Sequence, residues 1–268
     1  MSDLRIFSYL PNPRIWKATI AARLTGVALE IRGAKPGELA DWLWDFDARP
    51  LSDKERAAAA DVLQVGGRTG FTGTLFKTQA FLDAQPFGTV PAAFSPDGRI
   101  GIFESNSIMR AVARLGADAF PLYGRDAYTA SRIDGFLDAA LVFARDSQIF
   151  LLALRGDGPD SELHARTRQA FDAYMAGIER ALAPDRRFLV GDDVTLADIC
   201  FAAELTLFAN ERVRSARLVE RGLQPILPDA DSEYPQAMAH YQRLCAHPAF
   251  APDIGPYLSK LSAAEASP

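Results

Sequence analysis

The stretch GTVPAAFSPDGRIGIFESNSI, residues 88–108, decides the fold of the N-terminal half of the chain. Two short apolar segments flank a turn, and Asp97-Gly98 at that turn is a strong signal for a β-hairpin. A helical pattern, SNSIMRAVARLG, follows at once and ends at Gly116. The stretch therefore predicts a ββα unit.

A second unit precedes this one. Residues 4–9 (LRIFSY) have the character of a strand that ends at LPNP, because proline and asparagine favour a turn. The segment RIWKATIAARLTG has helical spacing of its apolar residues and stops at Gly26, and VALEIRG is a second strand. This order predicts a parallel βαβ unit with a right-handed crossover.

The remaining segments predict helices. Between the two units, ELADWLWDF (38–46) and SDKERAAAADVLQ (52–64) look helical, and the glycine-rich loop VGGRTGFTGT follows. Beyond the linker ADAFPLYG, four segments repeat apolar residues at three-and-four spacing: 126–154, 161–183, 196–213 and 234–250. The predicted fold class is therefore α/β plus all-α, a βαβ-ββα domain followed by an all-helical domain.

The composition and charge of the chain exclude several classes of protein function. Hydrophobic residues make up 49% of the 268 residues, and the net charge is −5, which argues against a dominant nucleic-acid or anionic-membrane surface. No run approaches the roughly 20 apolar residues of a membrane span, and the N-terminus lacks a signal pattern. Cys200 and Cys245 lack metal-ligand spacing and the histidines are scattered, so we predict no metal site and a reducing, cytoplasmic location.

Two places in the opening stretch are candidates for binding a small molecule. Pro91 starts a strand, and in the cis form it would leave the Val90 N–H and C=O for an extended peptide; a plain strand-initiating proline is the alternative. A helix that begins at Glu104-Ser105 attracts a carboxylate to its N-terminus. Ser105 would bind that carboxylate and Glu104 a ligand ammonium, with simple helix capping as the alternative.

A third candidate follows the first strand. Ser8, Tyr9 and Asn12 are hydroxyl or amide donors near the C-terminal end of a strand, where ligands of α/β proteins usually bind. Donors of this kind stabilise a thiolate. Spacing does not say which of them would face a sulfur atom, and all three would equally serve to shape the turn.

One motif in the C-terminal half is a folding feature. Thr195 and Asp198 have the spacing of a helix capping box, and Val194 and Ile199 suit a hydrophobic staple across it. Cys200 lies in the apolar helix that follows and is predicted to be a core residue rather than a nucleophile.

Three segments in the same order resemble the cytosolic glutathione transferases. FLDAQPFGTVPAAFSPDGRIGIFESNSIMRAVARL is similar to their glutathione-binding half, RFLVGDDVTLADICFAAEL to their C-terminal capping motif, and YPQAMAHYQRLCAHPAF to their last helices. YLPNPRIWKATIAARLTG and IFESNSI most resemble the transferase-like domain of eukaryotic elongation factor one gamma. That domain has Asn, Arg and Lys at positions matching Asn12, Arg14 and Lys17.

The resemblance implies a thioredoxin-like domain over residues 1–116 and an all-helical domain over 124–258. Residues 34–67 depart from the pattern as an insertion that contains Trp42, Trp44 and Phe46. These aromatic residues would form the wall of a substrate pocket, a subunit contact or a local core. The insertion puts the usual contacts to the glycyl carboxylate of glutathione in doubt.

The same resemblance implies a site for glutathione as co-substrate. Val90 and cis-Pro91 would pair with its cysteinyl main chain, and Glu104 and Ser105 would bind its γ-glutamyl end. These are the atoms that the residue patterns already single out.

The catalytic position aligns at or next to Asn12, which would hydrogen-bond the thiolate, with Ser8 and Tyr9 as further candidates. Arg14 would add positive potential near the sulfur or bind the glycyl carboxylate. The resemblance implies a homodimeric glutathione transferase that acts in detoxification. In its reaction the thiolate of glutathione would attack a small hydrophobic electrophile, aromatic or halogenated. The alternative is a non-catalytic interaction module like that of elongation factor one gamma.

Overall fold

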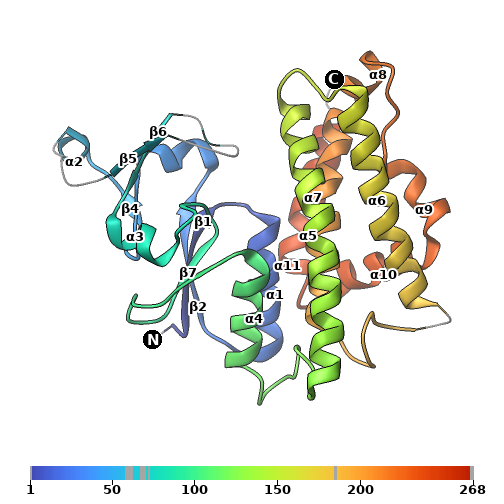
Figure 1. Ribbon diagram of the computed structural model, residues 1–268, viewed down its shortest axis with the longest axis horizontal. Coiled ribbons are helices and arrows are strands. Elements are labelled where there is room, and N and C mark those ends of the chain that lie inside the picture. The colour runs from blue at the N-terminus through green and yellow to red at the C-terminus, as the bar shows by residue number, and fades with distance from the viewer. Residues whose placement is uncertain (1, 58–62, 67–70, 72, 184–185, 266–268) are drawn as a thin grey trace. The chain divides into compact units, whose positions relative to one another are not determined.

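The computed structural model of the chain describes residues 2–57, 63–66, 71, 73–183 and 186–265 (Figure 1). Its contacts divide it into two compact units, Met1–Phe120 and Pro121–Pro268. None of the helices in the described ranges combines the length and apolar character that crossing a membrane requires.

The first unit contains the predicted βαβ-ββα arrangement. Its elements are β1 (Leu4–Tyr9), α1 (Pro13–Thr25), β2 (Leu29–Ala34), β7 (Ala92–Phe94), β8 (Gly101–Phe103) and α4 (Ser105–Leu115). The strand order is β2-β1-β7-β8, with β1 and β2 parallel and the other pairs antiparallel. Helices α1 and α4 cover one face of this sheet (Figure 1). The predicted thioredoxin-like fold of this unit is confirmed.

Local sequence signals set both ends of α1. The Asn12 side chain accepts a hydrogen bond from the Arg14 N–H at 3.0 Å, and Pro13 occupies the first helical position, where no N–H is needed. Gly26 ends the helix in the left-handed conformation with φ of 78°. Three residues therefore separate the end of β1 from the start of α1, so these two ends lie close together.

Residues between β2 and β7 form a second sheet. Its elements and the helices beside it are a 3₁₀-helix η1 (Pro36–Asp41), β3 (Trp42–Trp44), β4 (Arg49–Pro50), α2 (Asp53–Ala57), β5 (Leu63–Gly66), β6 (Thr74–Lys77) and α3 (Gln79–Ala84). The strand order is β4-β3-β6-β5, with β3 and β6 parallel. This sheet lies on the face of the first sheet opposite α1 and α4 (Figure 1).

The helices predicted over 38–46 and 52–64 are therefore wrong in large part. The first segment gives a short 3₁₀-helix and then a strand, and the second gives a five-residue helix and a strand. Residues 58–62, and residues 67–70 and 72 of the predicted glycine-rich loop, lie outside the described residues. Helical spacing over nine residues is too short to outweigh strand pairing, and aromatic residues favour strands.

Aromatic side chains join the two sheets in one core. Trp44 is buried, donates its indole N–H to the Leu39 carbonyl at 3.0 Å, and its ring lies 5.4 Å from that of Phe7 on β1. Phe81 of α3 and Phe94 of β7 belong to the same buried cluster. Burial of several large rings explains why the second sheet packs firmly on the first.

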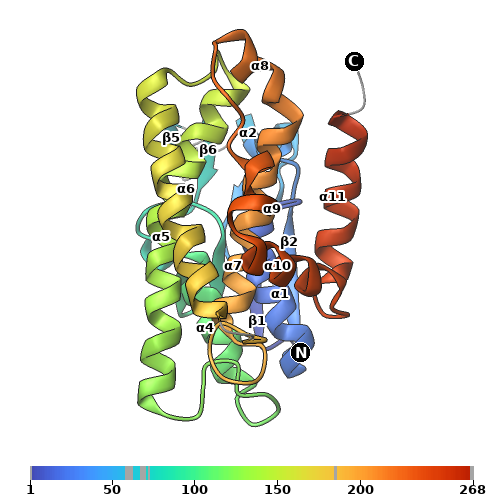
Figure 2. The same cartoon turned by 90° about the vertical axis from the view of Figure 1, so that its right-hand side faces the viewer.

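In its described residues the second unit contains helices joined by loops and turns, with no strand (Figure 2). Its elements are α5 (Ala127–Arg155), α6 (Ser161–Leu182), α7 (Leu196–Phe208), η2 (Ala209–Arg214), α8 (Ser215–Glu220), η3 (Leu227–Asp229), α9 (Ala230–Glu233), α10 (Pro235–Ala246) and α11 (Ala251–Glu265). Every residue of α7 except Leu207 is buried, so α7 is the central helix. The predicted capping box of Thr195 and Asp198 at its start is confirmed.

Candidate functional site

The strand register gathers the predicted site residues at one end of the first sheet. Phe7 of β1 is paired with Ala92 of β7, and Ala92 is paired with Phe103 of β8. Residues that follow Phe7, precede Ala92 and follow Phe103 therefore lie along the same edge. These are the three segments that the sequence singled out: 8–14, 90–91 and 104–105.

The middle segment presents main-chain groups. The Val90–Pro91 peptide bond is cis, as predicted, and β7 begins only at Ala92. No hydrogen bond among the described residues uses the Val90 N–H or C=O. An extended peptide that binds here would therefore find one donor and one acceptor on Val90.

The loop before Val90 is held by a buried glutamine. The Gln85 amide donates to the Thr89 carbonyl at 2.9 Å and to the Thr89 hydroxyl at 2.8 Å, and its oxygen accepts from the Phe87 N–H. Gln85 is only 1% exposed. Gln85, five residues before Val90, was not among the site residues predicted from the sequence.

Glu104 has an unusual backbone. Its φ of 66° and ψ of 126° make it the one non-glycine residue with positive φ in the described part of the chain. Such a conformation costs free energy in a residue with a Cβ and is concentrated at functional sites. Glu104 is exposed and immediately precedes α4, so its carboxylate is accessible to a ligand.

Ser105 is the first residue of α4 and is bonded to a buried lysine. The Lys17 ammonium lies 2.7 Å from Asn106 Oδ1 and 3.4 Å from Ser105 Oγ. Lys17 is 1% exposed although it lies in the middle of α1. The positive charge of Lys17 and the partial positive charge at the start of a helix both favour an anion at this end of α4. The sequence identified Lys17 only as a match to a lysine in the transferase-like domain of elongation factor one gamma.

Asn12 and Ser8 are both buried. The Asn12 side chain caps α1 with its oxygen and donates from Nδ2 to Ser8 Oγ at 3.1 Å. Asn12 is 1% exposed and Ser8 fully buried. An amide nitrogen carries two hydrogens, so the bond to Ser8 uses one of them and leaves the second available to a ligand that reaches it.

Tyr9 and Arg14 are the more accessible members of this segment. Both are partly exposed, and the Tyr9 ring lies 6.3 Å from the ring of Phe71 in the second sheet region. A phenol or a guanidinium at this edge is able to reach solvent without movement of the main chain.

The described residues contain no cluster of three or more His, Cys, Asp or Glu side chains arranged to hold a metal ion. Both cysteines lie in the second unit, and Cys200 is buried. Burial raises the pKa of the Cys245 thiol to about 11, which makes it a poor nucleophile.

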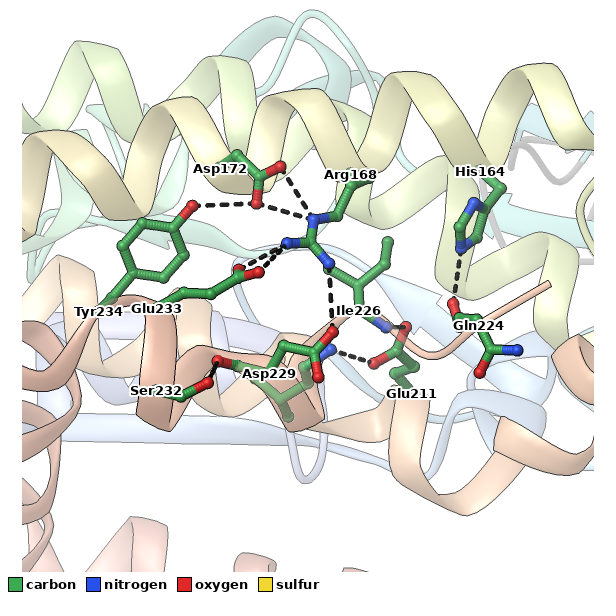
Figure 3. Close-up of polar contacts among 11 residues, drawn as sticks. His164, Arg168, Asp172, Glu211, Gln224, Ile226, Asp229, Ser232, Glu233 and Tyr234 are labelled. Atoms are coloured by element: carbon green, nitrogen blue, oxygen red, sulfur yellow. Dashed lines mark hydrogen bonds and ion pairs between the residues drawn. The ribbon is translucent and has the colours of Figure 1, made fainter.

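The second unit has an open hollow of about 650 Å³ beside α6, lined by His164, Ala165, Arg168, Gln169, Asp172, Ala173, Ala176 and Tyr234. Figure 3 shows the polar contacts of His164, Arg168, Asp172 and Tyr234. Arg168 does not offer its charge to a ligand there, because it pairs with Asp172 at 2.9 Å and Glu233 at 2.5 Å. Burial and a hydrogen bond to Asp172 raise the pKa of Tyr234 to about 12. These bonds attach α9 to α6, so Arg168, Asp172 and Tyr234 have a structural role in this hollow.

Comparison with known sequences supports the interpretation of both units. Residues 161–243 match the family of the glutathione S-transferase C-terminal domain. A probable elongation factor 1-gamma 1 of Arabidopsis thaliana is 32% identical over 141 residues, which is 50% of this chain and 32% of that protein. The glutathione S-transferase-like protein FUS3 of Gibberella moniliformis is 26% identical over 204 residues, 75% of this chain and 74% of that protein.

Solved structures show the same fold. A glutathione S-transferase of Methylobacterium radiotolerans, in complex with glutathione sulfonate, covers 94% of this chain and 94% of its own, with 21% identity and a TM-score of 0.62. Ure2p in complex with glutathione covers 94% of this chain and 98% of its own, with 16% identity and a TM-score of 0.59. The chain therefore has the glutathione transferase fold, and both glutathione S-transferase-like proteins and elongation factor 1-gamma proteins are among the sequences similar to it. It spans about a third of the length of the elongation factor that it matches.

Proposed function

We propose that the protein is a glutathione-dependent transferase that binds glutathione along the edge of the first sheet. The observation that carries this proposal is the juxtaposition of the Val90 main chain with Glu104 and Ser105, fixed by the pairing of β7 with β8. Two of the proteins of similar fold were solved with glutathione or its sulfonate, which supports the same ligand here.

Each part of glutathione has a matching group. The cysteinyl N–H and C=O pair with the C=O and N–H of Val90 beside Pro91, as in the addition of an extended strand. The γ-glutamyl carboxylate binds at Ser105 and the start of α4, and its ammonium binds the Glu104 carboxylate. The cysteinyl sulfur then lies toward the segment that follows β1.

The chemistry proposed is nucleophilic attack by the glutathione thiolate. Asn12 donates a hydrogen bond to the sulfur, with Ser8 and Tyr9 as the other candidate donors, and Arg14 adds positive potential or binds the glycyl carboxylate. The sulfur forms a bond to an electrophilic carbon, and the leaving group departs with the electron pair of the broken bond. Conjugation, ether cleavage and dehalogenation of aromatic or halogenated compounds all follow this scheme.

Substitution of Asn12 by aspartate tests the thiolate donor. Aspartate is as good a helix cap as asparagine, so Asn12→Asp should retain α1 while a carboxylate replaces the donor. We expect kcat/KM with glutathione and an aryl halide to fall about 100-fold, as when one oxyanion donor is removed. The ultraviolet absorbance of bound thiolate should show a raised pKa of the glutathione sulfur.

Ser8→Ala and Tyr9→Phe are the matched variants. If Asn12→Asp has wild-type activity and one of these loses it, the assignment of Asn12 is wrong. If the wild-type protein is not retained on immobilised glutathione and consumes no thiol with a panel of electrophiles, the enzyme proposal itself fails.

The second candidate function is a non-catalytic interaction module. It is favoured by the elongation factor 1-gamma relatives, which match this chain over about half its length. Retention on glutathione without turnover of any electrophile in the panel would favour this alternative.

We also propose that the protein is a cytoplasmic homodimer that acts in detoxification. Phe87 is 69% exposed and Ile100 65% exposed in the first unit, and the Phe87 ring contacts Phe103 at 5.4 Å between ring centres. Exposed apolar side chains of this kind suit a contact with a second copy of the chain.

A further inference from the structure

The second sheet reaches the proposed glutathione site through one lysine. Lys77 is the last residue of β6 and is paired in register with Trp44 of β3. It is 4% exposed, and its ammonium lies 4.7 Å from the centre of the Trp44 ring. A buried ammonium over an indole face is favourable only where its N–H groups also find acceptors.

One of those acceptors is the main chain of the loop before Pro91. Lys77 Nζ donates to the Gly88 carbonyl at 2.7 Å, two residues before Val90. Gly88 has φ of 62°, and a Cβ at this position would lie 3.2 Å from Lys77 Nζ. The positive φ of Gly88 favours glycine at this position, and the loop lies in close contact with Lys77.

Gln85 holds the same loop from the other side. Its amide bonds the Thr89 carbonyl, and the Gly88 N–H donates to the Gln85 carbonyl at 2.9 Å. The carbonyls of the two residues before Val90 are thus both fixed by buried side chains. A fixed loop presents the Val90 N–H and C=O without the entropy cost of ordering them when a peptide binds.

We propose that Lys77 is a positioning residue for glutathione, and that the second sheet is part of the binding site through it. This inference rests on the proposed function. Lys77 does not touch the ligand; it fixes the Gly88 carbonyl and thereby the main chain of Val90.

Lys77→Met tests this role because methionine keeps most of the apolar stem and removes the charged donor. We expect the Kd for glutathione, measured by calorimetry, to rise about tenfold while kcat at saturating glutathione changes less than twofold. Hydrogen exchange of the amides in residues 86–90 should become faster in the absence of glutathione. Lys54→Met, at an exposed lysine of α2, is the matched control and should keep the wild-type Kd and exchange.

A purely structural role predicts a lower melting temperature with an unchanged Kd and unchanged exchange of residues 86–90, and that result would overturn the proposal. If Lys77→Met does not fold, Lys77→Gln makes a milder change with the same expected rise in Kd. Absence of glutathione binding in the wild-type protein overturns the proposed function itself. Wild-type binding together with an unchanged Kd in both variants overturns only the role of Lys77.

Discussion

Asp198, in the first turn of α7, is a buried carboxylate with both oxygens bonded. One oxygen accepts from the Thr195 N–H at 2.8 Å and its hydroxyl at 2.9 Å. The other accepts from the Leu189 N–H at 3.0 Å and lies 2.9 Å from His240 Nε2. A single residue therefore connects the loop before α7, the start of α7 and the side of α10.

Removal of the Asp198 carboxylate should destabilise the folded protein. We expect Asp198→Ala to lower the free energy of unfolding by about 3–5 kcal/mol, because it leaves several buried donors without an acceptor. Urea unfolding followed by circular dichroism measures the loss. The exposed Asp193→Ala is the control and should change the free energy by less than about 0.5 kcal/mol. Equal losses in the two variants would contradict this role for Asp198.

For individual residues, type and spacing predicted the capping box of α7 completely, because its bonds join residues three apart. They also predicted the groups of the candidate site but not their accessibility. Asn12 and Tyr9 are three residues apart, yet Asn12 is buried and Tyr9 is partly exposed. That difference comes from packing of α1 on the sheet, which local sequence does not encode.

Among the elements, the short helix α9 depends on a charged attachment to α6. Arg168 of α6 pairs with Asp172 of the same helix, with Glu233 of α9 and, at 3.6 Å, with Asp229 of η3 (Figure 3). The Asp172 carboxylate is the main reason that the pKa of Arg168 is raised. A four-residue helix has little stability of its own, so this network holds it in place.

Arg168→Met should loosen α9. The change leaves three carboxylates near one another, and we expect the free energy of unfolding to fall by about 1 kcal/mol at low salt. The loss of free energy should be smaller in 1 M salt, where the Debye length is only about 3 Å. Screening then weakens both the attraction that Arg168 provided and the repulsion among the carboxylates that remain. Urea unfolding at the two salt concentrations measures this. Arg166→Met, whose partner Asp146 lies 3.4 Å away, is the control and should lose less. A salt-independent loss would show that packing rather than charge is responsible.

For the molecule as a whole, the proposed homodimer depends on apolar residues that the first unit leaves exposed. We expect the protein to run as a dimer in size-exclusion chromatography with light scattering. Phe87→Asp should shift it toward a monomer, because a carboxylate placed in an apolar contact must lose its water. Val219→Asp, at an exposed apolar residue of α8, should remain a dimer. A monomeric wild-type protein would contradict the proposal, and a dimeric Phe87→Asp would remove Phe87 from the interface.

The sequence by itself determined the βαβ-ββα and helical arrangement, the caps of α1 and α7, and the residue types of the candidate site. Each depends on contacts between near neighbours or on long periodic patterns. Only the tertiary structure decided the second sheet, the burial of Asn12 and the bond from Lys77 to Gly88. These depend on pairings between distant segments: WLW becomes a strand because β6, some thirty residues later, offers it backbone partners and a place to bury Trp44. Local propensity is too weak to specify such pairings.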